Sequence, residues 1–228
     1  MSGPMIGHIR ALALRPRRGA APLPVEAAVA IAGAGLDKDV HADPLSPRQL
    51  LLAGAGTYAA LALAPHALGE NLLLDIDTAQ LHSGTVLQLG SAVRLRLMFQ
   101  CEACGQLELH RPGLAHALGP RRGMLARVLA GGALRAGDPV RDLGPLLPAW
   151  ADDWRLRVAR VLDAAPPGEV VTYAQLARLA GIQSSYCRAL PALLRKLGPA
   201  YAGKAVAQGA QLSSPRWQGA GLFDDACE

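Results

Sequence analysis

The sequence predicts a mostly β, barrel-like domain with few helices at residues 1–143 and a small α-rich winged helix at residues 152–215. Short β-like runs broken by Gly, Pro and Asp recur up to residue 143, which is the pattern of a barrel or sandwich. A Gly/Pro-rich stretch follows and predicts a linker at residues 144–151. Beyond it the apolar residues recur with a helical period, and residues 216–228 form a tail.

The composition limits the class of protein. Of the 228 residues, 51% are hydrophobic but only 4% aromatic, so Ala, Leu and Val must build most of the core. The net charge of +5 is compatible with an anionic ligand or nucleic acid. Four cysteines are too few for a disulfide scaffold, and no apolar run reaches the roughly 20 residues that span a bilayer. The N-terminus lacks the charge order of a secretory signal, so we expect a cytoplasmic protein with reduced thiols and no membrane partner.

The first domain is expected to be built from short strands and two helices. The expected strands cover residues 6–14, 25–32, 85–89, 93–99 and 138–140. One helix is expected at residues 46–55, because Ser46 can cap it, Pro47 suits its first position, and three leucines follow. A second helix is expected at residues 121–129.

The second domain is expected to contain three short helices with tight turns, as in helix-turn-helix and winged-helix modules. The first, capped by Asp152 or Asp153, ends at residue 164 and should bury one apolar face. That face comprises Leu156, Ala159, Val161 and Leu162. Thr172 should cap a helix at residues 173–179, and a third helix should follow at 186–197 with a kink or break at Pro191.

Several polar residues of the first domain stand next to glycines or strand ends. Lys38, Asp39 and His41 follow Gly33 and Gly35, although a solvated charged turn would have the same composition. Further polar residues of this kind are Arg48, the pair Glu70 and Asn71, the thiols Cys101 and Cys104, and the pair Arg121 and Arg122. A cationic Arg48, Arg121 or Arg122 near a thiol would lower its pKa and hold a phosphate.

The order of these segments resembles the MOSC family, the C-terminal domain type of molybdenum cofactor sulfurases. The matching segments are GLDKDVH, SPRQLLL, LGENLLL, LHSGTVLQLG, CEAC and RRGMLARVLAGGALRAGDPV, and they span residues 6–143. The resemblance implies a β-barrel-like fold that binds molybdenum cofactor of the molybdopterin type. It also implies sulfur transfer or the reduction of N-hydroxylated compounds, so the small-molecule partner would be an N-hydroxylated substrate or a sulfur donor. These 228 residues are not expected to include the pyridoxal phosphate domain of the sulfurases.

The resemblance places the family's single cysteine on Cys104, which would be the catalytic residue and the metal ligand. Ala103 stands where a proline is common in the family. The implied cofactor-binding residues are Lys38, Asp39, His41, Arg48, Glu70, Asn71, Arg121 and Arg122. A thiolate is a soft metal ligand and a strong nucleophile, which suits this chemistry. Taken from the residues alone, Cys104 is more typical of a buried inert thiol, and a dithiol pair with Cys101 is favoured over a zinc ligand.

The second domain resembles the DNA-binding domain of O6-alkylguanine alkyltransferases and alkyltransferase-like proteins over residues 152–212. By that resemblance Thr172, Tyr173 and Arg188 would contact nucleic acid, Arg188 by insertion into the base stack. Ala202 and Gly203 stand where the family has its alkyl-accepting cysteine and the histidine that activates it. Alkyl transfer is therefore excluded on this alignment. A winged helix kept for packing or dimerisation remains the alternative.

Together the two resemblances predict an enzyme, a molybdenum-dependent oxidoreductase or sulfur transferase, with a DNA-binding-like module. In one version the module exposes a modified base whose N-hydroxylated amino group is reduced at Cys104. A non-enzymatic DNA-lesion recognition protein and a carrier of sulfur or cofactor are the alternatives.

Overall fold

The computed structural model of the chain describes residues 3–103, 105–210 and 214–224. It divides into two compact units. Unit 1 comprises Met1–Pro44 and Arg48–Trp150, and unit 2 comprises Leu45–Pro47 and Ala151–Glu228. No described helix is long and apolar enough to cross a membrane.

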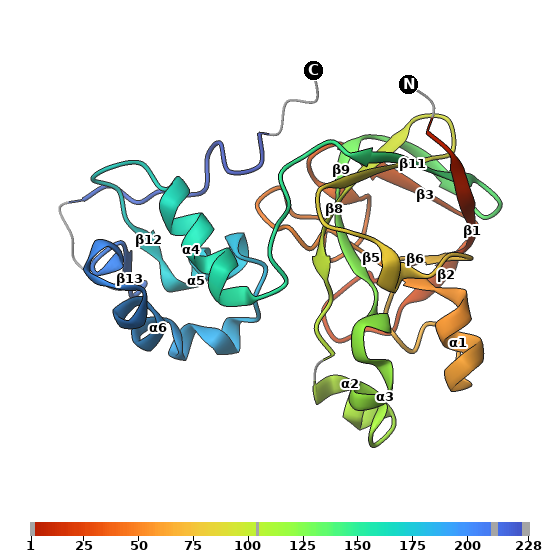
Figure 1. Cartoon of the computed structure of the whole chain (residues 1–228), viewed down its shortest axis with the longest axis horizontal. Helices are drawn as coiled ribbons and strands as arrows, with labels where there is room; N and C mark the ends of the chain where they lie inside the picture. The colour runs from red at the N-terminus through yellow and green to blue at the C-terminus, as the bar shows by residue number, and fades with distance from the viewer. Residues whose placement is uncertain (1–2, 104, 211–213, 225–228) are drawn as a thin grey trace. The chain divides into compact units, whose positions relative to one another are not determined.

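Unit 1 is a closed barrel of seven strands (Figure 1). Their bounds are β1 (Met5–Leu14), β5 (Leu50–Gly54), β6 (Leu72–Leu74), β7 (Thr85–Leu89), β8 (Val93–Gln100), β9 (Met124–Ala130) and β11 (Pro139–Pro145). The order around the barrel is β11-β7-β8-β9-β5-β6-β1, and pairing of β1 with β11 closes it. The β5–β6 pair is parallel and the other pairs are antiparallel. The expected β-rich, barrel-like domain is confirmed.

Shorter elements are added to this barrel. The strand β2 (Leu23–Val25) pairs with β1. A second sheet has the order β10-β3-β4, formed by Gly132–Arg135, Ala27–Ile31 and Gly35–Leu36. The helices are α1 (Ala55–Leu61), α2 (Gly105–His110) and α3 (Leu114–Leu118), with 3-10 turns η1 (Thr78–Gln80) and η2 (Gly119–Arg122). The barrel interior is filled by aliphatic side chains such as Leu52, Leu72, Leu87, Leu95 and Leu97.

Two helix predictions for this unit are wrong. Residues 50–54 form β5 rather than part of a helix, and all five residues are buried because β6 and β9 flank the strand. A continuous apolar run is typical of a strand covered on both faces as well as of a buried helix. Residues 124–130 form β9, where the buried Arg127 donates to Pro44 O at 3.1 Å. Only the preceding residues 119–122 are helical, as the 3-10 turn η2.

The expected strands at 85–89 and 93–99 match β7 and β8, and the strand expected at 6–14 matches β1. The stretch expected as a linker begins within β11, which extends to Pro145. Leu147 N then donates to Gly84 O at 3.1 Å, and Trp150 N to Ser83 Oγ at 2.7 Å. Residues 144–150 therefore continue the structure of unit 1.

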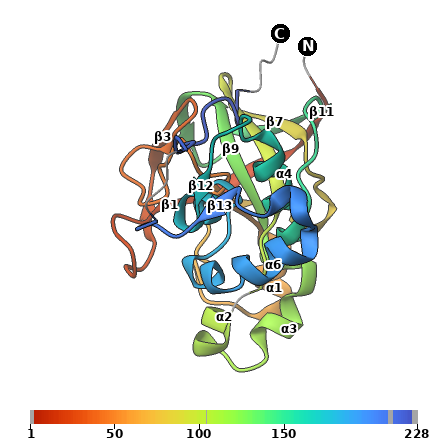
Figure 2. The same cartoon turned by 90° about the vertical axis from the view of Figure 1, so that its left-hand side faces the viewer.

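Unit 2 is built from short helices and one pair of two-residue strands (Figure 1 and Figure 2). Its elements are α4 (Trp154–Ala164), β12 (Val171–Thr172), α5 (Tyr173–Leu179), η3 (Ser184–Arg188), α6 (Leu190–Leu197), η4 (Pro199–Tyr201) and β13 (Ala205–Val206). The strands β12 and β13 are parallel. Asp153 caps α4, and Pro191 separates η3 from α6 by standing in the first turn of α6, as expected.

The helix α4 buries Val161 and Leu162 as predicted, but the first turn of its buried face differs from the prediction. Leu156 is 59% exposed, whereas Arg157 is 1% exposed and Val158 is fully buried. Arg157 is accommodated because Nε donates to Ala180 O at 2.9 Å and Nη1 donates to Asp152 O at 2.6 Å. The guanidinium thus joins the start of α4 to the end of α5.

Candidate functional site

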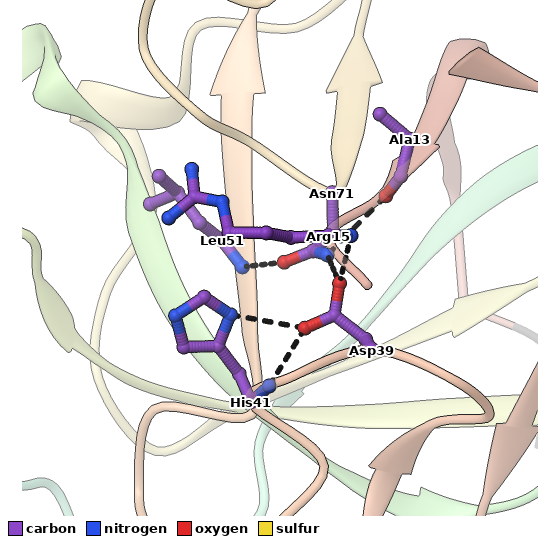
Figure 3. A network of polar contacts seen from close by, with 6 residues as sticks. All are labelled: Ala13, Arg15, Asp39, His41, Leu51 and Asn71. Atoms are coloured by element: carbon purple, nitrogen blue, oxygen red, sulfur yellow. Dashed lines mark hydrogen bonds and ion pairs between the residues drawn. The ribbon is translucent and has the colours of Figure 1, made fainter. Parts of the chain in front are cut away.

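Asp39 is the centre of a polar network that joins three segments of unit 1 (Figure 3). Its carboxylate is fully buried. Oδ2 accepts Arg15 N and Asn71 Nδ2, each at 2.8 Å. Oδ1 accepts His41 N at 2.8 Å and lies 2.9 Å from His41 Nδ1. Every donor to this carboxylate is therefore fixed by backbone or by a second contact.

Asn71 holds the network against the barrel. Its Oδ1 accepts Leu51 N at 3.1 Å, and its Nδ2 also lies 3.3 Å from Ala13 O. Leu51 belongs to β5 and Ala13 to β1, so the amide bridges two barrel strands to the loop that carries Asp39. The predicted residues Asp39, His41 and Asn71 are thus brought together.

The pKa of Asp39 reflects two opposed effects. Burial alone would raise it, but the hydrogen bonds from the His41 side chain and from the backbone of Arg15 and His41 lower it below its ordinary value. The carboxylate is therefore ionised at neutral pH. The His41 imidazole remains 43% exposed.

Glu70 forms a second buried cluster with residues of α1 and the loop after it. Tyr58 OH donates to Glu70 Oε2 at 2.5 Å, and His66 Nδ1 lies 3.0 Å from Oε1. Tyr58 OH also accepts Leu68 N at 3.1 Å. Burial raises the pKa of Tyr58, and the negative charge of Glu70 raises it further. Glu70 therefore serves as a fixed, fully partnered carboxylate.

Arg15 lies between these two clusters. Its backbone N–H binds Asp39, and its backbone oxygen accepts Val40 N at 2.7 Å. Its guanidinium lies over Gly69, where an added Cβ would come within 2.5 Å of Arg15 Nη2. Arg15 Nε is buried and makes no hydrogen bond to any described residue. Gly69 has a φ of +67°, so backbone conformation and close approach both favour glycine there.

Cys101 directly follows β8 and lies beside a cation. Its thiol is nearly buried, and Arg48 Nη2 lies 3.9 Å from Sγ. Its backbone N–H donates to Gly123 O at 2.8 Å. The contact of Arg48 with Cys101 was not predicted, because the arginines were expected near the Cys104 thiol. The predicted catalytic thiol, Cys104, lies outside the described residues.

The turn η2 brings two more arginines to the strand end that carries Cys101. Arg121 Nη2 donates to Ala117 O at 2.7 Å, and its side chain lines a pocket of about 260 Å³ with Thr57, Asp75 and Asp77. Arg122 has Nε and Nη1 buried without a hydrogen-bond partner among the described residues. Its charge also acts on the Tyr58 hydroxyl.

Lys38 is separate from these clusters. Its side chain is exposed, and its φ of +62° places it in the left-handed turn before Asp39. Lys38 therefore contributes to the site through its backbone, which forms the turn that orients Asp39. No group of three or more His, Cys, Asp or Glu side chains in the described part of the chain is arranged to hold a metal ion.

Three partners of these clusters were not found by sequence reasoning: Arg15, Tyr58 and His66. A buried carboxylate requires hydrogen-bond donors, so Glu70 implied such partners without indicating which residues supply them. The position of Tyr58 and His66, 12 and 4 residues before Glu70, is the signal that was available.

The predicted nucleic-acid residues of unit 2 lie on α5 and η3. Thr172 Oγ1 accepts Gln175 N at 3.2 Å, which confirms its predicted role as a helix cap. Tyr173 is half-buried, and its backbone oxygen lies 3.5 Å from Cys187 Sγ. Arg188 is exposed at the end of η3, and Ala202 and Gly203 are exposed after η4.

The comparison with protein families supplies the identification of unit 1. The model of one family, described as the MOSC domain, matches residues 45–141. Residues 45–141 of this chain are therefore similar to the MOSC domain. The match covers most of the barrel, including β5 to β9 and both arginines of η2. It ends before unit 2, so the predicted alkyltransferase-like module stays a prediction.

Several solved structures share the fold of this chain at low sequence identity. The YUAD protein from Bacillus subtilis is 17% identical with a TM-score of 0.54, covering 61% of this chain and 97% of its own. YiiM from Geobacillus stearothermophilus is 14% identical with a TM-score of 0.53 and coverage of 83% and 100%. YiiM from Escherichia coli is 20% identical with a TM-score of 0.50 and coverage of 85% and 94%. No curated protein matches the sequence.

Proposed function

We propose that this chain binds molybdenum cofactor in its MOSC domain and reduces N-hydroxylated compounds, with Cys104 as metal ligand and catalytic thiol. The proposal rests on the family match at residues 45–141 and on the resemblance that assigns the cysteine. One observation from the described residues carries it. Buried guanidinium nitrogens of Arg15 and Arg122 have no hydrogen-bond partner there.

These orphaned donors fit the group that the family binds. A buried guanidinium without an acceptor is unfavourable, and a phosphate supplies both charge and acceptor oxygens. Arg122 and Arg15 would hold the phosphate of the pterin, and Arg121 would face the pocket beside it. Arg48 lies against Cys101, three residues before Cys104, so a cation stands beside this segment.

A bound molybdenum cofactor supplies two-electron redox chemistry at this thiol. The reduction consumes two electrons and two protons for each N-hydroxylated group. The N–O bond breaks, the nitrogen becomes an amine, and the oxygen leaves as water. The two electrons must come from an external donor, either one reduced flavin or two equivalents of a one-electron donor such as an iron–sulfur protein. The protein contributes the fixed charges of Asp39 and Glu70 and the cations that hold the anionic ligand.

The test is elemental analysis of protein expressed with molybdenum cofactor available. We expect molybdenum in the wild-type protein and in Cys101→Ala, and its loss in Cys104→Ala. Cys101→Ala is the matched control because both substitutions remove a thiol from one CxxC. Retention of metal by Cys104→Ala with loss in Cys101→Ala would move the ligand to Cys101. Metal-free wild-type protein that does not reduce hydroxylaminopurine would contradict the proposal.

Sulfur transfer is the alternative chemistry at the same thiol. In that case Cys104 would carry a persulfide, and mass spectrometry of the isolated protein would detect a mass gain of one sulfur atom on its peptide. An unmodified, metal-free thiol would contradict both the carrier and the reductase.

For unit 2 we propose DNA binding without alkyl transfer. The favouring observation is that Arg188 is exposed on η3 beside α5, with Arg195 and Lys196 exposed on α6. Gel-shift assays with O6-alkylguanine and unmodified duplexes test it on metal-free protein. We expect Arg188→Ala to weaken lesion binding more than Arg155→Ala, which alters an exposed arginine on α4. Equal binding by the wild type and both variants would contradict this role, and lesion binding without reductase activity would favour a pure recognition protein.

A further inference from the structure

We propose that His41 is a proton-transfer residue whose ring is held by Asp39 so that Nε2 delivers the proton. The proposal deepens the proposed function and rests on it for the reaction that the proton serves. It stands on the hydrogen-bond geometry around Asp39 and on the difference in exposure between the two side chains.

The geometry determines which nitrogen of His41 carries hydrogen. Arg15 N and His41 N are backbone groups and can only donate to Asp39. Asn71 Oδ1 accepts Leu51 N, so its Nδ2 must be the atom that donates to Asp39 Oδ2. With three donors on it, the carboxylate acts as an acceptor, and His41 Nδ1 at 2.9 Å must supply the fourth hydrogen. The neutral ring therefore has its lone pair on Nε2.

The burial pattern separates the two members of the pair. The Asp39 side chain is 0% exposed, whereas that of His41 is 43% exposed. The carboxylate therefore cannot exchange protons with bulk solvent, while the imidazole can. Asp39 orients the ring and keeps a compensating negative charge beside it whenever Nε2 takes up a proton. This is the division of roles in which a buried acid positions a histidine that moves protons.

Asp39 and His41 also lie near Arg15, a cation of the candidate site. In Figure 3 the guanidinium of Arg15 and the ring of His41 extend to the same side of Asp39. Arg15 Nε is buried without a partner among the described residues, so this side presents one anion-binding group and one proton-transfer group. A structural histidine would be expected to have both ring nitrogens engaged in the interior.

In the proposed reduction, His41 Nε2 first takes up a proton from solvent and then gives it to the oxygen of the breaking N–O bond. That oxygen leaves as water, and solvent supplies the second proton to the nitrogen. The two electrons come from the external donor named above. The ring then recovers a proton from solvent at Nε2 through its exposed edge.

The tautomer is tested without any activity measurement. Two-bond ¹H–¹⁵N correlation spectra of the full chain, labelled on histidine, report which ring nitrogen is protonated. We expect the Nδ1–H form for His41, assigned by the signal that disappears in His41→Gln. An Nε2–H form in the wild-type protein would overturn the inference. Asp39→Asn should convert the ring to the Nε2–H form. If Asp39→Asn does not fold, His41→Gln still assigns the wild-type signal, because it alters a side chain that is 43% exposed.

Activity and rescue test the proton transfer itself. In molybdenum-loaded protein with reduced methyl viologen as electron donor, we expect His41→Ala to reduce hydroxylaminopurine about 10²-fold more slowly. Added imidazole should restore part of the rate. His116→Ala, which removes an exposed histidine of α3, should keep the wild-type rate. A wild-type rate for His41→Ala, or a loss that imidazole does not restore, would overturn the role of His41.

The two proposals fail in distinguishable ways. If loaded wild-type protein does not reduce hydroxylaminopurine, the proposed function fails, and the tautomer spectrum still decides how His41 is held. If the wild type is active and His41→Ala is equally active, the proposed function stands and His41 has no part in it.

Discussion

The side-chain amide of Asn71 donates to Asp39 Oδ2 at 2.8 Å, joining residues separated by 32 positions in the chain. Both residues are buried, and each is held by backbone groups of a further segment. The contact fixes the loop after β4 onto the strands β1 and β5. The orientation of His41, and with it the proposed chemistry, therefore depends on a contact that is itself remote from solvent.

Asp39→Asn should lower the free energy of unfolding by about 3 kcal/mol at pH 7. The NH₂ group of the new amide would replace one carboxylate oxygen and would face N–H donors, from which it cannot accept a hydrogen bond. Urea denaturation measures this difference, with Asp37→Asn, an exposed neighbour, as the control.

The same variant predicts a pH dependence. The pKa of Asp39 is lower in the folded protein than in the unfolded chain, so its contribution is complete above the unfolded pKa of about 4. It is lost as pH falls through the lower folded pKa. The difference between wild type and Asp39→Asn should therefore shrink in acid. A difference that is constant from pH 7 to pH 3 would contradict the ionised state.

Gly69→Ala should separate backbone strain from the position of Arg15. Its matched control is Gly19→Ala, because Gly19 has a φ of +77° with nothing within 4 Å of an added Cβ. Both variants should lose about 1–2 kcal/mol from the left-handed backbone conformation. Only Gly69→Ala displaces the Arg15 guanidinium, so it alone should bind phosphate about tenfold more weakly by calorimetry. Equal phosphate affinities of Gly69→Ala and Gly19→Ala would show that Arg15 does not bind the anion.

Arg157→Met should destabilise unit 2 by about 2–4 kcal/mol, because it removes the donor to the buried carbonyl group of Ala180 and to the part-buried contacts with the carbonyl groups of residues 151 and 152. Arg155→Met, an exposed change on the same helix, should alter stability by no more than about 0.5 kcal/mol. Thermal denaturation followed by circular dichroism gives both values. Similar effects from the two variants would show that the buried guanidinium has no special role.

Tyr58→Phe should reduce stability and weaken its dependence on alkaline pH. The raised pKa keeps Tyr58 protonated when the folded protein is brought above pH 10. Its contribution is complete below the unfolded pKa of about 10 and declines as pH rises toward the folded value. Urea denaturation between pH 8 and pH 11 should show a smaller alkaline decline in Tyr58→Phe. An identical decline in both proteins would mean that Tyr58 is not linked to folding.

Much of the fold could be predicted from local pattern, and the failures share one physical cause. The strand β7 was predicted with its correct bounds because turn residues delimit a short β-branched and apolar run. The strands β5 and β9 were read as helices because both faces are buried, so neither shows alternation. Arg127 in β9 and Arg157 in α4 are buried cations satisfied by backbone oxygens of distant segments. Such partners cannot be read from a local window.

The candidate site was predicted in its residue types better than in its pairings. Asp39, His41 and Asn71 were named from separate motifs and meet in one network. Arg48 was expected near Cys104, which lies outside the described residues, and the thiol that it contacts is Cys101. Arg15 could not be predicted because it follows a strand and belongs to no motif. Its place in the candidate site depends on the backbone geometry that puts its guanidinium over Gly69.

The pairing of β1 with β11 sets a condition on how unit 1 folds during synthesis. Met5 pairs with Arg141, so the first strand to emerge must wait for nearly the whole unit before its outer edge is covered. Until then its unpaired backbone groups are open to other chains. Closure of the barrel is therefore a late, long-range event, and a ribosome stalled before residue 139 would hold a chain whose first and seventh barrel strands cannot meet.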